Sequence, residues 1–155
     1  MIVKIARTIF IFIVSPVVVG FLLSTANADT YCFEKAGVYY NVSPALLTAI
    51  SYVESKRDPN AVHHNTNGSV DRGHMQINSC WKRSLSAGWN HLSTPCYCTM
   101  VGAWILRQCV DRYGYDWDAV VCYHMGKASS ELEHRKKQQA ANYVGKVQFA
   151  ITNFK

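Results

Sequence analysis

The 155-residue sequence lacks the signals of several protein classes. It contains no His-Glu-x-x-His pattern and no pair of histidines four residues apart on a predicted helix, so a zinc enzyme is not expected. Ser55 lacks the flanking glycines of a nucleophile elbow, which argues against a serine hydrolase. No basic cluster is larger than Arg135-Lys136-Lys137, which argues against a nucleic-acid partner. No repeat, linker or low-complexity run divides the chain.

Only the N-terminus contains a long apolar run, Ile9–Leu23. It is shorter than the ~20 apolar residues that a membrane-spanning helix needs. Lys4 and Arg7 precede it, and the small residues of Ala26-Asn27-Ala28 follow it, as in a secretory signal peptide. We therefore predict a signal peptide that is cleaved after Ala28, with an uncleaved membrane anchor as the alternative.

Cleavage would leave residues 29–155 as one exported domain, long enough to bury a hydrophobic core. The chain has 16 basic and 10 acidic residues. This modest basic balance suits an anionic polymer such as the cell wall, but it equally suits ordinary solubility.

The six cysteines all lie in the exported part. An even number of cysteines in an exported domain predicts disulfides, although the sequence alone leaves their connectivity open. Cys109 and Cys122 fall on consecutive predicted helices, and a helical hairpin would bring them together. A metal site at Cys80, Cys96 and Cys98 is the alternative, but thiols in an oxidising compartment pair first.

One predicted helix, Ala45–Glu54, has a clear beginning, because Ser43 suits the N-cap and Pro44 the first helical position. Its apolar side follows the helical period at Leu46, Leu47, Ile50 and Val53. Glu54 lies four residues after Ile50, on or beside this side. An apolar setting disfavours the ionised carboxylate and favours a proton donor. The alternative is that Glu54 ends the helix in solvent, paired with Lys56 or Arg57.

The segment after this helix predicts a small β-region. Asn67-Gly68 is a strong hairpin signal. Asp71 and Gly73 then lead into Met75-Gln76-Ile77-Asn78, which alternates apolar and polar residues. We expect Gln76 and Asn78 to face the chemistry, with Met75 and Ile77 packed beneath. Gly73 would allow a close approach of the backbone to a ligand.

The other expected elements are helical. They are a short helix over residues 31–40, another over 80–87, helices over 94–114 and 116–123, and a final helix after Ser130. The final helix shows a buried face at Ala140, Tyr143, Val144, Val147, Ile151 and Phe154.

Together these motifs resemble the lysozyme-like lytic transglycosylases. The likeness runs from about Cys32 to about Gly126 and is strongest to small peptidoglycan-cleaving enzymes that accompany bacterial secretion and conjugation machines. The matching residues are Glu54-Ser55, Asn67-Gly68-Ser69, Asp71-x-Gly73-x-Met75-Gln76-Ile77-Asn78 and Tyr123-x-x-Gly126. His74 departs from the usual small or apolar residue, often Leu, and His124 from the usual Asn.

The resemblance implies a mostly helical α+β fold, lysozyme-like, with a small β-hairpin region and disulfide staples. Cys32 and Cys96 look like the pair shared by similar proteins. With Cys109–Cys122 also paired, elimination leaves Cys80 with Cys98.

The resemblance also assigns the site. Glu54 would be the catalytic acid and then the base, and Asp71 a second carboxylate whose alternative role is turn chemistry. The expected substrate-binding residues are Ser55, Gly73, Met75, Gln76, Asn78, Tyr123 and His124. For Gln76 and Asn78 the alternative is hydrogen bonding to loop backbone, and for Tyr123 it is an ordinary core position. No cofactor or metal is expected.

The implied activity is cleavage of the bond between N-acetylmuramic acid and N-acetylglucosamine, with a 1,6-anhydro product, in the periplasm. The expected partners are peptidoglycan strands and components of a secretion or conjugation machine, and the expected state is a monomer. Two alternatives stay open. One is a lysozyme-type hydrolase, and the other is a non-catalytic wall-binding or scaffold protein.

Overall fold

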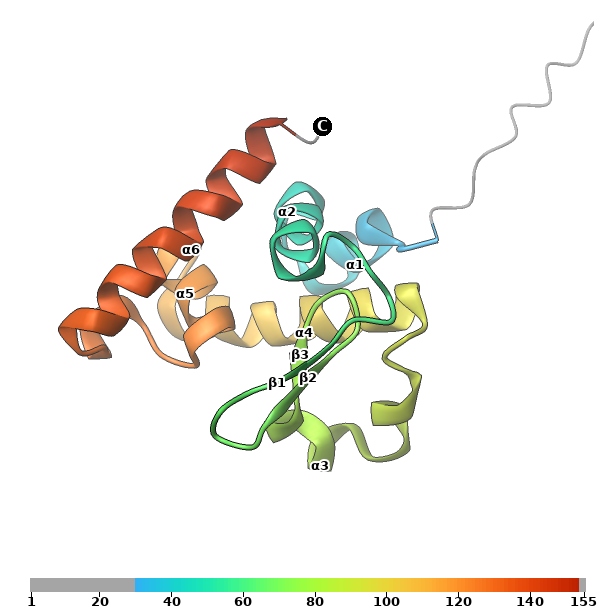
Figure 1. Cartoon of the computed structure of the whole chain (residues 1–155). Coiled ribbons are helices and arrows are strands. Elements are labelled where there is room, and N and C mark those ends of the chain that lie inside the picture. The colour runs from blue at the N-terminus through green and yellow to red at the C-terminus, as the bar shows by residue number, and fades with distance from the viewer. Residues whose placement is uncertain (1–29, 154–155) are drawn as a thin grey trace, which may run out of the picture.

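The computed structural model describes residues 30–153, so the predicted signal peptide, residues 1–28, lies outside them. The mostly helical α+β architecture is confirmed (Figure 1). The helices are α1 Phe33–Tyr40, α2 Pro44–Ser55, α3 Lys82–Leu85, α4 Pro95–Tyr113, α5 Trp117–Met125 and α6 His134–Asn153. The strands are β1 Val62–His64, β2 Val70–Arg72 and β3 Ile77–Asn78, and 3₁₀ turns cover 79–81, 86–91 and 129–131. No helix in this part of the chain is long and apolar enough to cross a membrane.

Helix α2 begins and ends as its sequence predicts. The Ser43 hydroxyl accepts a hydrogen bond from the backbone N–H of Leu46 at 3.3 Å, an N-cap contribution of about 1 kcal/mol. Leu47 and Ile50 are fully buried, each stabilising the fold by about 2 kcal/mol. After Ser55 the backbone turns left-handed at Lys56 and Arg57, which stops the helix and leaves Glu54 in its last turn.

Helix α4 runs through the middle of the molecule, and α1 and α5 pack against it (Figure 1). Its buried residues form much of the core. Two disulfides attach its neighbours: Cys32–Cys96 joins it to the start of α1, and Cys109–Cys122 joins it to α5. Both bonds match the predicted pairs. Helix α6 packs against α2 and α5.

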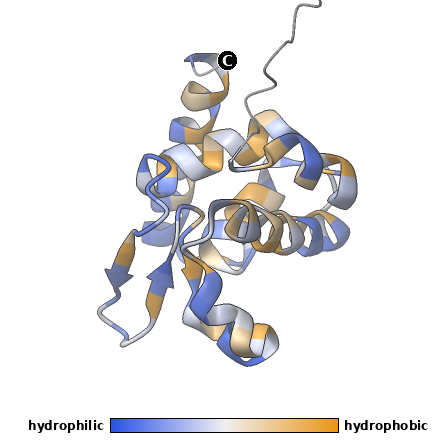
Figure 2. Cartoon of the chain, turned by 90° about the vertical axis from the view of Figure 1, so that its right-hand side faces the viewer, coloured by the Kyte–Doolittle hydropathy of each residue, from blue (hydrophilic) through white to orange (hydrophobic). Residues whose placement is uncertain are grey.

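The predicted β-region is an antiparallel sheet with strand order β1-β2-β3. Its first turn contains Asn67 and Gly68, as predicted, but the loop is longer than two residues because β1 ends at His64 and β2 begins at Val70. Asn65 N–H donates to the Ser69 carbonyl across the loop. The turn projects from the helices and carries no strongly hydrophobic residue (Figure 2).

The predicted Cys80–Cys98 bond is wrong, because the structure leaves both thiols free. Cys98 faces inward on α4, where a Cβ added to Gly73 would lie only 2.7 Å from its sulfur. Cys80 is exposed in the 3₁₀ turn after β3. Elimination assumed that every cysteine pairs, but one of these thiols points into the core and the other toward solvent.

Candidate active site

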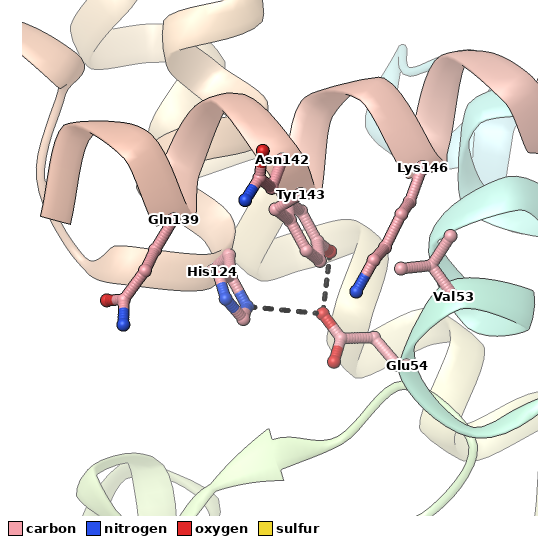
Figure 3. Close-up of a pocket in the computed structure, with 7 residues that line it drawn as sticks. All are labelled: Val53, Glu54, His124, Gln139, Asn142, Tyr143 and Lys146. Carbon is pink, nitrogen blue, oxygen red and sulfur yellow. Dashed lines mark hydrogen bonds and ion pairs between the residues drawn. The ribbon is translucent and has the colours of Figure 1, made fainter. Parts of the chain in front are cut away.

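The Glu54 side chain, at the end of α2, lies against residues of α5 and α6. It is only 13% exposed. The Tyr143 hydroxyl, from α6, donates a 2.6 Å hydrogen bond to Glu54 Oε1. His124, from α5, places Nδ1 3.7 Å from the same oxygen (Figure 3). Glu54 Oε2 makes no hydrogen bond to any residue in 30–153. One carboxylate oxygen is therefore held in place, while the other is available to a ligand.

Two hollows meet at Glu54. The first, which we call the Glu54 cavity, has a volume of about 460 Å³ and is lined by Val53, Glu54, His124, Gln139, Asn142, Tyr143 and Lys146 (Figure 3). The second, the sheet-side groove, has a volume of about 730 Å³ and runs past the sheet and α5. Its wall includes Glu54, Asp71, Gln76, Asn78, Trp81, Tyr123 and His124. A long polymer could therefore pass Glu54 on both sides.

The second carboxylate, Asp71, lies in the middle strand of the sheet. Its Oδ1 accepts a 2.7 Å hydrogen bond from the Asn78 amide, and its Oδ2 accepts a 2.8 Å bond from the Asn65 amide. These two amide donors hold both carboxylate oxygens in place. Asp71 therefore forms a fixed negative charge in the wall of the sheet-side groove.

Tyr123 lies beside the catalytic candidate, as the resemblance implies, but its hydroxyl is already occupied. It donates to the Met75 carbonyl at 2.8 Å. Burial, and then the charge of Glu54, raise the pKa of Tyr123 well above its usual value. It therefore stays neutral and ties α5 to the segment before β3.

Gln76 and Asn78 line the sheet-side groove, but both also make internal hydrogen bonds. Gln76 Nε2 donates to the Gly73 carbonyl at 2.9 Å, which is the loop-backbone contact left open above. Asn78 donates to Asp71 and accepts from the Cys80 N–H. Gln76 Oε1 has no partner within 30–153, so it remains available to a sugar hydroxyl.

Three residues expected to bind substrate instead support the fold. Met75 is fully buried and packs where α4 has Gly102. Ser55 donates to the His74 carbonyl at 2.9 Å. Gly73 has φ +72° and approaches protein rather than ligand, because an added Cβ would lie 2.3 Å from the Leu92 carbonyl oxygen. These residues hold β3 against the helices, which fixes the groove wall.

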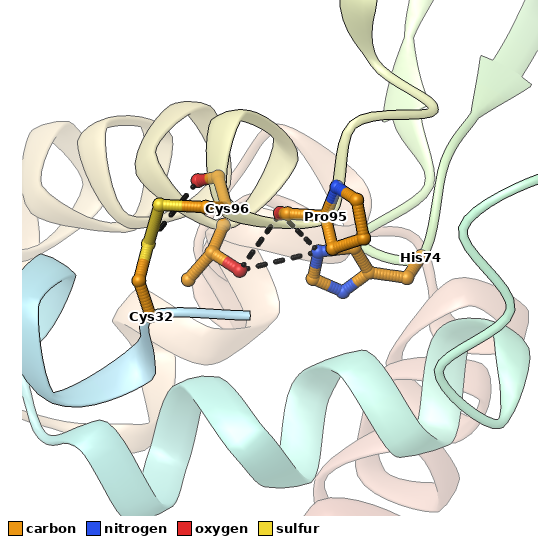
Figure 4. The surroundings of a disulfide bond; sticks show 5 residues. Cys32, His74, Pro95 and Cys96 are labelled. Atoms are coloured by element: carbon orange, nitrogen blue, oxygen red, sulfur yellow. Dashed lines mark hydrogen bonds between the residues drawn. A yellow bond between two sulfur atoms is a disulfide. The ribbon is translucent and has the colours of Figure 1, made fainter. Parts of the chain in front are cut away.

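His74 is fully buried, and its ring lies beside Pro95 (Figure 4). Its Nε2 lies 2.9 Å from the Pro95 carbonyl, which can only accept, so Nε2 carries the proton. Nδ1 then accepts from the Ser51 hydroxyl at 2.7 Å. Burial lowers the pKa of His74 to about 4, with the Pro95 hydrogen bond opposing and the Arg57 charge assisting. This neutral imidazole joins α2 to α4.

Sequence reasoning missed two residues of the site. Tyr143 was expected only as a core residue of the last helix, yet its hydroxyl binds Glu54. The available signal was that a buried tyrosine hydroxyl usually needs a partner. Lys146 was not considered, and it lines the Glu54 cavity. No cluster of three potential metal ligands occurs in the part of the chain that the structure describes.

Comparison with known proteins identifies the family. The transglycosylase SLT domain family matches residues 31–144, most of the chain. The chain belongs to this family. The SLT match contains Glu54, Asp71, Tyr123, His124 and Tyr143 and ends just before Lys146.

Several curated relatives match this SLT-family chain over most of its length. Invasion protein IagB of Salmonella typhimurium (strain LT2) is 38% identical over 125 residues, which is 78% of each chain. Protein IpgF of Shigella flexneri is 36% identical over 121 residues, 76% of this chain and 78% of its own length. X polypeptide of Escherichia coli (strain K12) is 32% identical over 130 residues, covering 81% and 77%.

Proposed function

We propose that this SLT-family protein is a peptidoglycan lytic transglycosylase that cleaves between N-acetylmuramic acid and N-acetylglucosamine. The geometry of Glu54 carries the proposal. A mostly buried carboxyl has one oxygen held by Tyr143 and the other available at the junction of two hollows. A general acid must be held within hydrogen-bond reach of its target, and this arrangement leaves one oxygen for that role.

In the proposed reaction, Glu54 first protonates the glycosidic oxygen, and the bond to the anomeric carbon breaks. The fixed charge of Asp71 and nearby dipoles stabilise the positive ring. Glu54, now a carboxylate, removes the proton from the 6-hydroxyl of the same muramic acid. That oxygen bonds the anomeric carbon and gives the 1,6-anhydro ring. Atoms balance without water, and Glu54 regains its proton.

The hydrolytic alternative would use a second carboxylate as nucleophile. Both Asp71 oxygens accept hydrogen bonds from amide groups, which supports a stabilising role rather than attack on the sugar. The tethered 6-hydroxyl has a high effective concentration and competes well with water. These two points favour the transglycosylase reaction over hydrolysis.

We further propose that the protein is exported to the periplasm and opens the wall locally for a secretion or conjugation apparatus. The N-terminal signal pattern supports export. The likeness to small enzymes of such machines, and the name "invasion protein" that IagB carries, support the second part. Export would be tested by following cleavage and fractionation of the full-length chain.

The function is tested with a peptidoglycan zymogram of wild-type protein and Glu54→Gln, which keeps the shape of the side chain and removes its titrating proton. We expect wild type to clear the gel and Glu54→Gln to leave it intact with a nearly unchanged melting temperature. Glu34→Gln, at an exposed carboxyl on α1, is the matched control. An inactive wild type would instead favour the wall-binding scaffold, and an active Glu54→Gln would exclude Glu54 as the acid.

A further inference from the structure

A further groove continues from the Glu54 cavity between α2 and α6. We call it the helix groove. Its volume is about 730 Å³ and it is lined by Tyr52, Val53, Lys56, Ala141, Asn142, Gly145, Lys146, Phe149 and Ala150. It shares Val53, Asn142 and Lys146 with the Glu54 cavity. The two hollows therefore form one path that leads away from the acid, and no residue of the sheet lines it.

The helix groove is cationic. Lys146 lies where the two hollows join and makes no hydrogen bond or ion pair to another residue in 30–153. Lys56 lies further along, with its Nζ 4.0 Å from the centre of the Tyr52 ring. Glu54 is the only carboxylate that lines either hollow. Two cations without a protein counter-ion favour an anionic occupant.

The shape of the groove also suits an extended chain with mixed chemistry. The wall is bare at Gly145, where an added Cβ would meet no heavy atom within 4 Å. Asn142 offers an amide that can donate and accept hydrogen bonds. At the far end, Phe149 is 64% exposed and presents an apolar surface. A peptide fits this groove, because its carboxylates suit the two lysines, its backbone amides suit Asn142, and its methyl groups suit Phe149.

We propose that the helix groove binds the acidic peptide stem of the substrate, so that the enzyme prefers peptide-bearing glycan to bare glycan. The proposal rests on the proposed function and deepens it. In peptidoglycan the stem is attached to N-acetylmuramic acid, the sugar whose bond Glu54 would break, so it must leave the site near Glu54. Among the described hollows, the route past Lys146 and Lys56 has two cations and no carboxylate beyond Glu54. The family match ends at residue 144, so Gly145, Lys146 and Phe149 lie beyond it.

The sheet-side groove also contains two cations, Arg112 and Lys136. That groove contains Asp71 as a fixed negative charge as well. An acidic peptide is repelled by such a carboxylate, whereas the helix groove beyond Glu54 has none. Charge therefore assigns the stem to the helix groove and leaves the sheet-side groove to sugar.

The test compares initial cleavage rates on glycan strands that bear peptides with rates on strands from which an amidase has removed them. Gly145→Leu fills the bare wall, and leucine is a better helix former than glycine, so the fold is preserved. The second variant, Lys56→Asn with Lys146→Gln, removes both charges. For each we expect the peptide-bearing to peptide-free rate ratio to fall about tenfold, the loss of a charge-assisted contact or its equivalent.

Lys137→Ala is the matched control, since Lys137 is exposed on the same helix and lines neither hollow. Its rate ratio should equal that of wild type. If Gly145→Leu and the lysine variant lower both rates equally, the groove receives sugar and the proposal is wrong. If neither variant changes either rate, the groove is not used and the proposal is also wrong.

A binding measurement separates this inference from the proposed function. Glu54→Gln protein is titrated with a disaccharide tetrapeptide and with the bare disaccharide, and amide chemical shifts are followed. We expect the disaccharide tetrapeptide, but not the bare disaccharide, to shift the amide signals of Gly145–Phe149. Gly145→Leu should weaken its binding about tenfold. Should wild type cleave neither substrate, the proposed function fails while this titration still decides the groove. Shifts confined to the sheet-side groove would overturn the proposal.

Discussion

The imidazole of His124 lies parallel to the phenol ring of Tyr143, with ring centres 4.0 Å apart and an interplanar angle of 4°. The same phenol donates its hydroxyl to Glu54. A stacked partner restricts the rotation of the ring, so His124 fixes the direction from which the hydroxyl approaches the acid. His124 therefore acts on Glu54 in two ways, directly from Nδ1 at 3.7 Å and through the ring of Tyr143.

Tyr143→Phe should slow cleavage about tenfold or more, because a hydrogen bond to a charged group contributes about 1.5–3 kcal/mol. The stack with His124 is kept, so the melting temperature should fall only by the few degrees that the loss of this hydrogen bond implies. His124→Ala is the complementary variant, which keeps the hydroxyl and removes the stack, and it should give a smaller loss of rate. The rate at which suspended peptidoglycan clears measures the activity of both variants. A Tyr143→Phe rate equal to wild type would show that the Tyr143 hydroxyl has no role in cleavage.

The product should be a 1,6-anhydro-muropeptide in wild type and in Asp71→Asn. The substitution removes the fixed charge and disturbs the bonds from Asn65 and Asn78, so the reaction slows, but the 6-hydroxyl still captures the ring carbon. Mass spectrometry of the digest decides, since a reducing end is one water heavier than an anhydro end. A digest dominated by reducing ends would place the protein with the hydrolases and make Asp71 the nucleophile or ion stabiliser.

Acid should destabilise the protein through His74. Its pKa is about 4 when folded and about 6.5 when unfolded. The unfolded chain therefore binds a proton first as the pH falls, and stability is lost between about pH 6.5 and pH 4. The free energy of unfolding, measured by urea titration, should fall by about 3 kcal/mol over this range from His74 alone.

His74→Leu is the comparison for that measurement. It is less stable at every pH, because the Ser51 hydroxyl and the Pro95 carbonyl lose their partner. Its free energy of unfolding should nevertheless fall less steeply between pH 6.5 and pH 4, since the titrating group is gone. Equal slopes in the two proteins would show that His74 does not carry the acid sensitivity.

Thiol titration should find one reactive group in the folded protein and two after denaturation without reductant. The reactive one is Cys80, which is exposed. Burial raises the pKa of Cys98 to about 12, and a protonated, buried thiol reacts slowly. Cys80→Ser should abolish the native reaction. If the denatured chain has no free thiol, Cys80 and Cys98 are bonded to each other, as predicted from the sequence.

Local features were predictable from the sequence. Ser43 as the N-cap and Pro44 at the first position set the start of α2, as the structure has it. The helical period placed Glu54 at the edge of the buried face. These features depend on neighbours within a few residues, which a single sequence contains. The order of helices and the small sheet followed from the same signals.

Long-range features were not predictable in this way. Gly73 was read as a residue that approaches ligand, but its neighbours are Leu92 and Cys98, from distant segments. The Tyr143 hydroxyl reaches Glu54 across 89 residues, and no period or spacing reports such a pair. The predicted pairing of Cys80 was wrong for a related reason. Whether a cysteine points into the core or toward solvent depends on how all the helices pack.

Glu54 and its partner Tyr143 on α6 lie 89 residues apart in the sequence, so they are synthesised at different times. Because a chain is synthesised from its N-terminus, Glu54 is made long before Tyr143 and Lys146. Until α6 docks, Glu54 has no hydroxyl to orient it, and both hollows on that side lack a wall. Under the proposed function, a chain that has not yet docked α6 is therefore inert toward the wall, and the docking of this helix completes the site.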